Sequence, residues 1–140
     1  MGAQLDELFK SHENYIKQIR VLDERMDELA PYEIAKLEYF YTRAERIAWR
    51  IAGEYKKEYK YYEGMAEIAQ GQEYKRIREG KKNTSTDGQY MSRITKGQML
   101  VEAAKHEGDF ISWKGIASSY ENAINALKDI IKAIDKQGGA

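Results

Sequence analysis

The sequence predicts an all-α protein whose long helices form a helical hairpin with coiled-coil-like packing and assemble into a homo-oligomer. The 140-residue chain contains one proline, and 33% of its residues are charged. Valine, which favours strands, occurs only twice. Apolar residues recur at alternating steps of three and four over most of the chain, the spacing of a helix face that packs on another helix. We therefore expect a single all-helical domain over residues 1–140.

The first helix is expected over about residues 4–29. A heptad stripe runs through it, formed by Leu5, Leu8, His12, Tyr15, Ile19, Leu22, Met26 and Leu29. His12 is the only weak member of this stripe, so we interpret it as a partly buried structural histidine. Pro31 disfavours helix before it and suits the first position of the next one.

The second helix is expected over about residues 31–79. Its apolar stripe includes Ile51, Tyr55 and Tyr62, and it continues the same stepping with Glu58 as the one break. A helix of this length reaches roughly 70 Å at about 1.5 Å per residue. Because a small monomer does not bury so long a stripe on itself, these residues are predicted to form an oligomer seam.

Two shorter helices are expected after a loop at about residues 80–94, which is rich in Gly, Asn, Ser, Thr and Asp. The third helix, about 95–107, would begin at Thr95, with Gln98 completing a capping box. Gly108 should break the chain there and leave His106 at a helix end. The fourth helix, about 109–135, adds Trp113, Tyr120, Leu127 and Ile134 to the predicted oligomer seam.

The sequence offers no support for enzymatic activity. It has no cysteine, only two histidines that are far apart, and no spacing typical of a metal site. The stretch "GKKNT" departs from a phosphate-binding loop, because Lys82 stands where Ser or Thr is needed. No apolar run approaches the roughly 20 residues of a membrane helix. We expect a non-enzymatic, cytoplasmic protein without cofactor, metal or membrane contact.

Charge is unevenly distributed although the net charge is zero. Residues 1–40 carry a net −4, residues 41–100 a net +5 and residues 101–140 a net −1. A basic segment with interleaved tyrosines is typical of surfaces that hold single-stranded nucleic acid through phosphate contacts and base stacking. The candidate binding residues are Lys56, Lys57, Tyr59, Lys60, Lys75, Arg76, Arg78, Lys81 and Lys82. The competing interpretation is a solvated helix face with no ligand.

The stretch "EYKKEYKYYEG", residues 54–64, is expected to divide its roles by face. Tyr55 and Tyr62 continue the apolar stripe, so they should lie in the core. Tyr59 stands one position off that stripe. It should therefore lie at the edge beside Lys56 and Lys60, where a ring and an ammonium group can meet one nucleotide.

Several stretches of the sequence, in their order along the chain, resemble the UvsY family, the recombination mediators of T4-like phages. They are the basic helix ending in "KYYEGMA", a variable polar loop, "VEAAKHEGDF", and "SWKGIASSYENAINALKDIIKAI". The Tyr-Tyr-x-Gly step of the family corresponds here to residues 61–64, and the resemblance covers about residues 40–137. Residues 1–39 fit the family only as a further helix.

The resemblance implies an all-helical, ring-like homo-oligomer that binds single-stranded DNA, helps remove the single-strand-binding protein and loads a RecA-type recombinase in a phage-infected bacterial cell. Of two basic DNA-contacting positions in the family, Lys56 matches the lysine, whereas Glu58 replaces the arginine. Lys57 and Lys60 could compensate, since a phosphate contact needs charge within reach. The alternative is a non-enzymatic helical scaffold or interaction protein, for example a phage-encoded adaptor or inhibitor of a host complex, with no nucleic-acid role.

Overall fold

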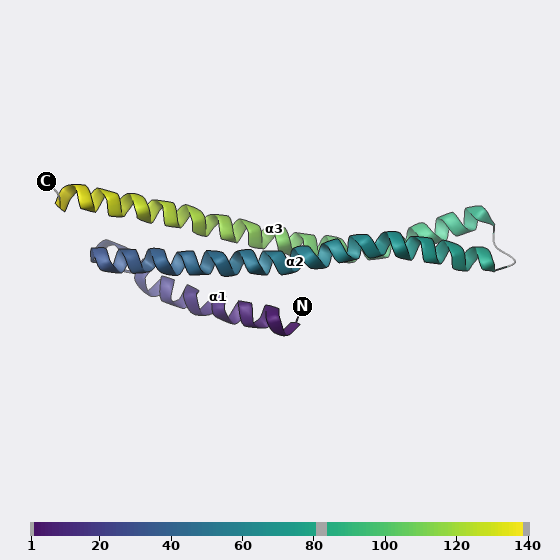
Figure 1. Cartoon of the computed structure of the whole chain (residues 1–140), viewed down its shortest axis with the longest axis horizontal. Coiled ribbons are helices and arrows are strands. Elements are labelled where there is room, and N and C mark those ends of the chain that lie inside the picture. The colour runs from purple at the N-terminus through teal and green to yellow at the C-terminus, as the bar shows by residue number, and fades with distance from the viewer. Residues whose placement is uncertain (1, 81–83, 139–140) are drawn as a thin grey trace. The chain divides into compact units, whose positions relative to one another are not determined.

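The computed structural model describes residues 2–80 and 84–138, and within these residues it is helical with no strand. Its elements are α1 (Gly2–Asp23), the short 3-10 helix η1 (Met26–Glu28), α2 (Pro31–Glu79) and α3 (Ser85–Gly138) (Figure 1). The all-α class is therefore as the sequence predicts. The bounds of α2 coincide with the expected range, whereas the other two long helices differ from it.

The first helix ends earlier than expected, at Asp23 rather than near Leu29. The amide of Arg25 donates to the carbonyl of Leu22, and that of Glu28 to the carbonyl of Arg25. These i to i+3 bonds tighten the chain into a 3-10 turn. The chain thereby reverses its direction before α2 begins.

The expected loop over residues 80–94 is wrong for residues 85–94, which belong to α3. The helix begins in a reciprocal cap. The amide of Thr84 donates to the Asp87 carboxylate and the amide of Asp87 to the Thr84 hydroxyl, both at 3.1 Å. These bonds satisfy amides that the first turn leaves without partners. The predicted cap at Thr95 is also wrong, because its hydroxyl donates to the carbonyl of Met91 inside the helix.

The expected break at Gly108 is absent, and the two predicted C-terminal helices form one helix of 54 residues. A glycine inside a helix costs only about 1 kcal/mol relative to alanine. Side chains on both sides of Gly108 pack against α2: the His106 ring stacks on Tyr62, and Phe110 lies 5.7 Å from the Tyr59 ring. This packing holds the helix through the glycine and places His106 in its interior, not at a helix end as predicted.

The chain forms two compact units rather than the single domain expected. Unit 1 comprises Met1–Gly53 and Ile111–Ala140, and unit 2 comprises Glu54–Phe110. The helices α2 and α3 contribute to both units.

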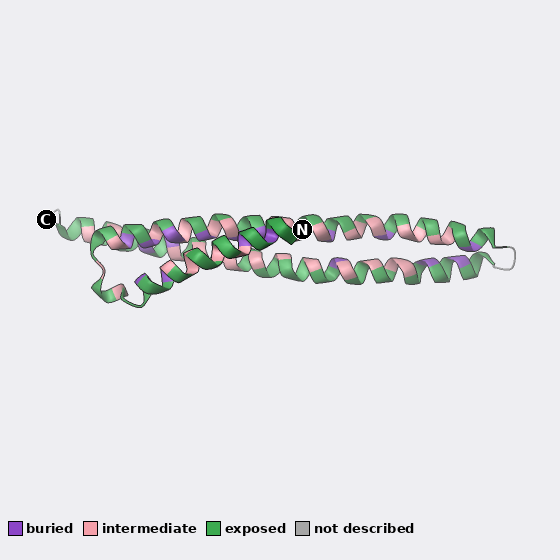
Figure 2. Cartoon of the chain, turned by 90° about the horizontal axis from the view of Figure 1, so that it is seen from below, coloured by how far each residue is buried: buried purple, intermediate pink, exposed green. Residues whose placement is uncertain are grey.

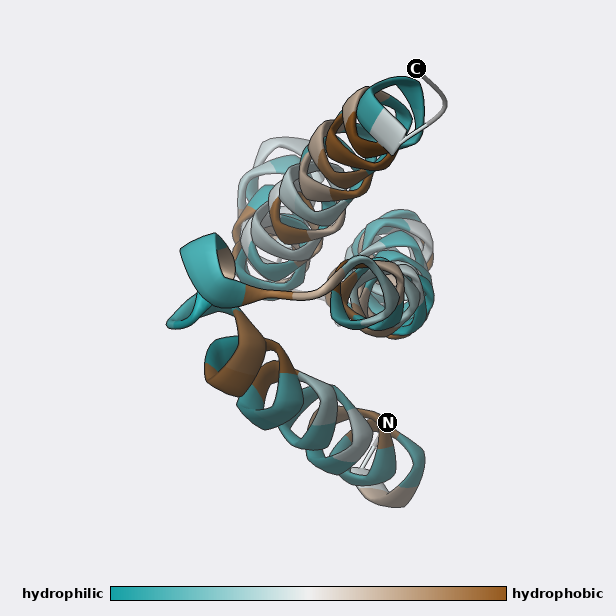
Figure 3. Ribbon diagram, turned by 90° about the vertical axis from the view of Figure 1, so that its left-hand side faces the viewer, coloured by the Kyte–Doolittle hydropathy of each residue, from teal (hydrophilic) through white to brown (hydrophobic). Residues whose placement is uncertain are grey.

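Unit 1 is a bundle of the three helices α1, α2 and α3, seen end-on in Figure 3. All three contribute to a cluster of buried apolar residues: Ile19, Leu22, Ile34, Leu37, Phe40, Ala44 and Leu127. Aromatic contacts surround this cluster. His12 lies against Trp113 and Tyr120, and the Tyr41 hydroxyl donates to Asp23 at 2.6 Å.

Unit 2 is a helical hairpin in which α2 and α3 run antiparallel, with buried positions on their facing sides (Figure 2). Its buried residues are mostly small: Ala66, Gly88, Ser92 and Ala103, with Tyr59 and Ile77. Small side chains let two helices approach closely. The ammonium of Lys96 reaches the Glu67 carboxylate at 2.7 Å and ties the two helices together.

The predicted oligomer seam is partly covered within the chain. Ile51 is fully buried and Leu127 is 5% exposed, and the remaining seam residues are partly buried: Tyr55, Tyr62, Trp113, Tyr120 and Ile134. The prediction assumed that one chain cannot cover a stripe as long as that of α2. The antiparallel return of α3 and the packing of α1 provide part of that cover, and the oligomer seam itself stays a prediction.

Candidate nucleic-acid interface

The predicted basic segment lies on α2 in unit 2, but Tyr59 is not available to stack on a base. Its side chain is 9% exposed and packs beside Phe110, with 5.7 Å between ring centroids. The expectation that Tyr59 lies at the edge is therefore wrong. The buried positions Ala52, Tyr59 and Ala66 recur every seven residues, which is a different stripe from the one that contains Ile51. The core face of a long helix drifts in this way because 3.6 residues per turn do not match a seven-residue repeat.

The neighbouring tyrosines Tyr55 and Tyr62 are half-buried and flank a single histidine of α3. The Tyr62 ring is parallel to the His106 ring within 7°, at 5.4 Å between centroids, and Tyr55 stacks at 6.4 Å. Burial raises the pKa of Tyr55, with a further contribution from the Asp109 charge. Both tyrosines are thus used in packing the hairpin, as the sequence predicts for the stripe that they share.

Several cations of the segment are paired with carboxylates on the same helix. Lys57 pairs with Glu54 at 3.4 Å and Lys60 with Glu63 at 3.7 Å. Arg76 pairs with Glu73 at 2.5 Å, an interaction that lowers the pKa of Glu73. Such exposed pairs are weak and can open, but each carboxylate offsets the positive potential of its partner. Lys56, Lys75 and Arg78 are exposed, and Lys81 and Lys82 lie outside the described residues.

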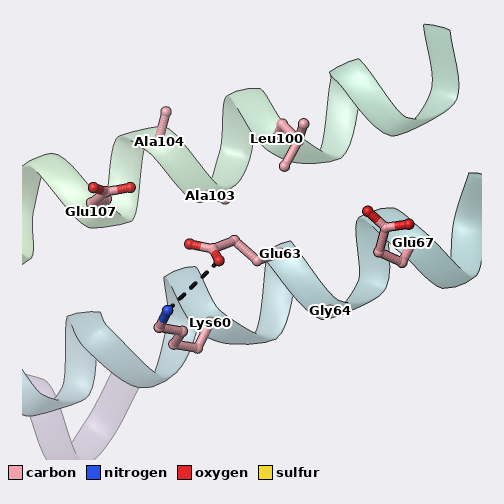
Figure 4. A pocket seen from close by; sticks show the side chains of 8 residues that line it. All are labelled: Lys60, Glu63, Gly64, Glu67, Leu100, Ala103, Ala104 and Glu107. Atoms are coloured by element: carbon pink, nitrogen blue, oxygen red, sulfur yellow. Dashed lines mark ion pairs between the residues drawn. The ribbon is translucent and has the colours of Figure 1, made fainter. Parts of the chain in front are cut away.

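A groove of unit 2 adjoins this segment on one side of the hairpin and is acidic. It has a volume of about 480 Å³, and three of its lining residues are Glu63, Glu67 and Glu107, with Lys60 as the cation among them (Figure 4). Three carboxylates against one ammonium disfavour a phosphate group. The structure therefore does not assemble the predicted residues into one cationic groove.

Unit 1 contains a second basic face that the sequence reasoning missed. Arg43, Arg46 and Arg50 stand at i, i+3 and i+7 on α2, so they share one side of that helix. They line a groove of about 380 Å³ against α1, where Ser11 and Tyr15 contribute hydroxyl groups. Within the part of the chain that the structure describes, neither Arg46 nor Arg50 forms an ion pair.

Exposed aromatic rings accompany these arginines. Tyr39 is 53% exposed and stands four residues before Arg43, whose guanidinium lies 5.8 Å from the centre of its ring. Trp49, 39% exposed, follows Arg46 by three residues. The Arg43 Nε donates a long hydrogen bond of 3.5 Å to the Tyr15 hydroxyl across the groove. We call Tyr39, Arg43, Arg46, Trp49 and Arg50 the arginine face.

No protein-family model matches this chain, and neither a curated protein nor a solved structure is significantly similar to it. The resemblance to the UvsY family thus stays a prediction from the residues quoted above.

The described residues offer neither a metal site nor a membrane-spanning helix. Among residues 2–80 and 84–138, no group of three or more histidine or acidic side chains is placed to hold a metal ion. No helix described by the structure is long and apolar enough to cross a bilayer.

The arginine face combines what a phosphate backbone and an unpaired base require. Guanidinium groups make bidentate contacts with phosphate, and flat exposed rings stack on bases. Glu7, which lines an adjoining hollow with Arg50, is the acidic group facing this region from α1. The spacing of the three arginines was visible in the sequence. Their role in a groove could not be recognised from the sequence, because only the fold shows that α1 forms the other side of that groove.

Proposed function

We propose that the protein is a non-enzymatic, helical protein that binds single-stranded DNA through the arginine face of unit 1. The observation that carries the proposal is the line of Arg43, Arg46 and Arg50 along one groove, with no ion pair at Arg46 or Arg50 among the described residues. Unpaired guanidinium groups on a rigid helix attract phosphates without first breaking an internal ion pair.

A single strand fits this surface better than a duplex does. Tyr39 and Trp49 expose flat rings beside the cations, and only unpaired bases can stack on them. Each stacked base contributes roughly 1–3 kcal/mol by alanine substitution. Such stacking tolerates any sequence, so we expect little base preference.

The biological role that we propose for this binding is recombination mediation, with a RecA-type recombinase and the single-strand-binding protein as protein partners. This part rests on the family resemblance alone.

The test is the salt dependence of binding to a fluorescently labelled poly-dT oligonucleotide, measured by anisotropy. The double variant Arg46→Gln, Arg50→Gln should bind more weakly and lower the slope of log K against log salt by about 1.4, since each phosphate contact to a single strand contributes about 0.7. Lys128→Gln with Lys132→Gln is the matched control, because it removes the same charge from exposed positions of α3 in unit 1.

Two results would count against the proposal. Equal affinities and slopes for wild type and the arginine variant would remove the arginine face as the binding site. A lower slope of log K against log salt in the double variant Lys56→Gln, Lys75→Gln, with no change in the arginine variant, would place the interface in unit 2, as the sequence predicts.

A further inference from the structure

The outward face of α3 in unit 2 exposes large apolar side chains on a heptad stripe of its own. Tyr90 is 66% exposed, Ile94 46% and Val101 57%. Together with Gly97, Ala104 and Gly108 they step by four, three, four, three and four residues. This stripe lies opposite the side of α3 that carries the buried Ser92 and Ala103. We call these six residues, from Tyr90 to Gly108, the outer α3 face.

The two glycines of this face have open space beside them. A Cβ added to Gly97 or Gly108 would meet nothing within 4 Å. Figure 4 shows the side chain of Ala104 pointing away from α2. Glycine destabilises a helix relative to alanine. The two open glycines leave room on this stripe for the side chains of a closely packed partner.

We propose that the outer α3 face binds the same face of a second copy of this chain, antiparallel, about a two-fold axis level with Met99. In an antiparallel helix pair this axis sets each residue opposite the one that lies equally far on the other side of position 99. Tyr90 thus faces the partner subunit's Gly108. Ile94 faces the partner subunit's Ala104, and Gly97 faces the partner subunit's Val101. The two-fold axis repeats each pairing in reverse. Every layer thus joins one large and one small residue, and the space beside each glycine receives a side chain.

The charges beside the stripe fit the same arrangement. Arg93 and Glu107 occupy equivalent heptad positions on one edge of the face, and antiparallel pairing brings each next to the other on the partner. Both are exposed, and neither forms an ion pair among the described residues. Two symmetric Arg–Glu pairs would therefore frame one edge of the contact.

Other registers lose this fit. An antiparallel shift of one heptad in one direction sets Gly97 opposite the partner subunit's Gly108, which leaves an empty layer. The shift in the other direction sets Tyr90 opposite the partner subunit's Val101, two large residues in one layer. Parallel pairing in register sets each glycine opposite its own copy. This dependence on register, in both size and charge, favours a second copy over an unrelated partner.

Cysteine cross-linking tests the geometry, because the natural chain contains no cysteine. The double variant Gly97→Cys, Val101→Cys should form a disulfide-linked dimer under mild oxidation, because the proposed axis sets each of these positions opposite the other on the partner subunit. Tyr90→Cys should not, because antiparallel pairing separates its two copies by roughly 27 Å at about 1.5 Å per residue. Cross-linking of Tyr90→Cys would overturn the proposal, since it indicates parallel helices, and the absence of a linked dimer in the double variant would overturn it as well.

Mass in solution tests the surface. Light scattering of the full chain at micromolar concentration should give twice the 16.2 kDa chain mass. Val101→Asp should raise the dimer dissociation constant at least about tenfold, because it buries an unpaired carboxylate in an apolar contact. Ile68→Asp, 52% exposed on α2, is the matched control and should leave the mass unchanged. A monomeric wild type would refute the pairing.

A charge reversal tests the register without relying on folding of any one variant. Arg93→Glu and Glu107→Arg should each weaken the dimer, because each creates two like-charge contacts across the axis. The double variant Arg93→Glu, Glu107→Arg restores both pairs and should recover the wild-type dissociation constant. Failure of the double variant to recover it, with helical content unchanged by circular dichroism, would overturn the proposed register.

Discussion

The imidazole Nε2 of His12 lies 2.7 Å from the phenol oxygen of Tyr120, so one hydrogen bond joins α1 to α3 in unit 1. The ring also stands edge-on to Trp113, 5.0 Å away. Burial in this aromatic cluster lowers the pKa of His12 and raises that of Tyr120. Both shifts favour the neutral forms, which are the ones that this hydrogen bond joins.

The first prediction concerns pH. Because the pKa of His12 is lower in the folded chain than its ordinary value of 6.5, the unfolded chain binds more protons as the pH falls through that value. Stability attributable to His12 is therefore present above about pH 6.5 and decreases below it, until the folded-state pKa is also passed. Urea unfolding at about pH 7.5 and pH 5.5 measures the loss. His12→Phe should show a smaller difference between the two, and an unchanged difference would contradict the assignment.

The second prediction concerns Tyr59, which the structure places in the hairpin core. Tyr59→Ala should lower the free energy of unfolding by roughly 3–5 kcal/mol, the usual cost of deleting a buried aromatic ring. Tyr61→Ala is the matched control, since Tyr61 is 59% exposed, and should cost much less. If the two variants had equal stability and Tyr59→Ala alone lost DNA affinity, Tyr59 would have the stacking role that the sequence suggested.

The third prediction concerns the start of α3. Thr84→Ala removes the hydroxyl that accepts from the Asp87 amide, and should cost about 1 kcal/mol, as loss of an N-cap does. Thr95→Ala should be close to neutral, because its hydroxyl only adds a bond to a carbonyl inside the helix. Chemical denaturation of both variants distinguishes this cap from the one predicted at Thr95.

The fourth prediction compares two helical glycines. A Cβ on Gly71 would meet nothing within 4 Å, so Gly71→Ala should raise stability by up to about 1 kcal/mol. A Cβ on Gly88 would lie 3.1 Å from two ring carbons of Tyr74. Gly88→Ala should therefore gain less than Gly71→Ala, or lose stability, unless the ring shifts. Thermal unfolding of the pair checks the order, and a larger gain at Gly88 would show that this contact is loose.

What the sequence determined by itself is the local structure. One proline, only two valines and apolar steps of three and four favour helices whatever they pack against. For this reason the start of α2 at Pro31 and the half-buried setting of His12 could be foreseen. The break expected at Gly108 could not be corrected locally. Glycine weakens a helix only modestly, and packing by Phe110 and His106 against the tyrosines of α2 outweighs it.

Only the tertiary structure decided which faces are covered. The core stripe of α2 moves around the helix along its 49 residues, so Tyr59 is buried although its local spacing suggested an edge. In the same way, Arg43, Arg46 and Arg50 face a groove only because α1 packs beside them. A heptad pattern specifies that a helix has an apolar face, but burial depends on a partner that can lie far away in sequence. That partner, here α3 folding back along α2, covers part of the stripe that the sequence assigned to an oligomer seam.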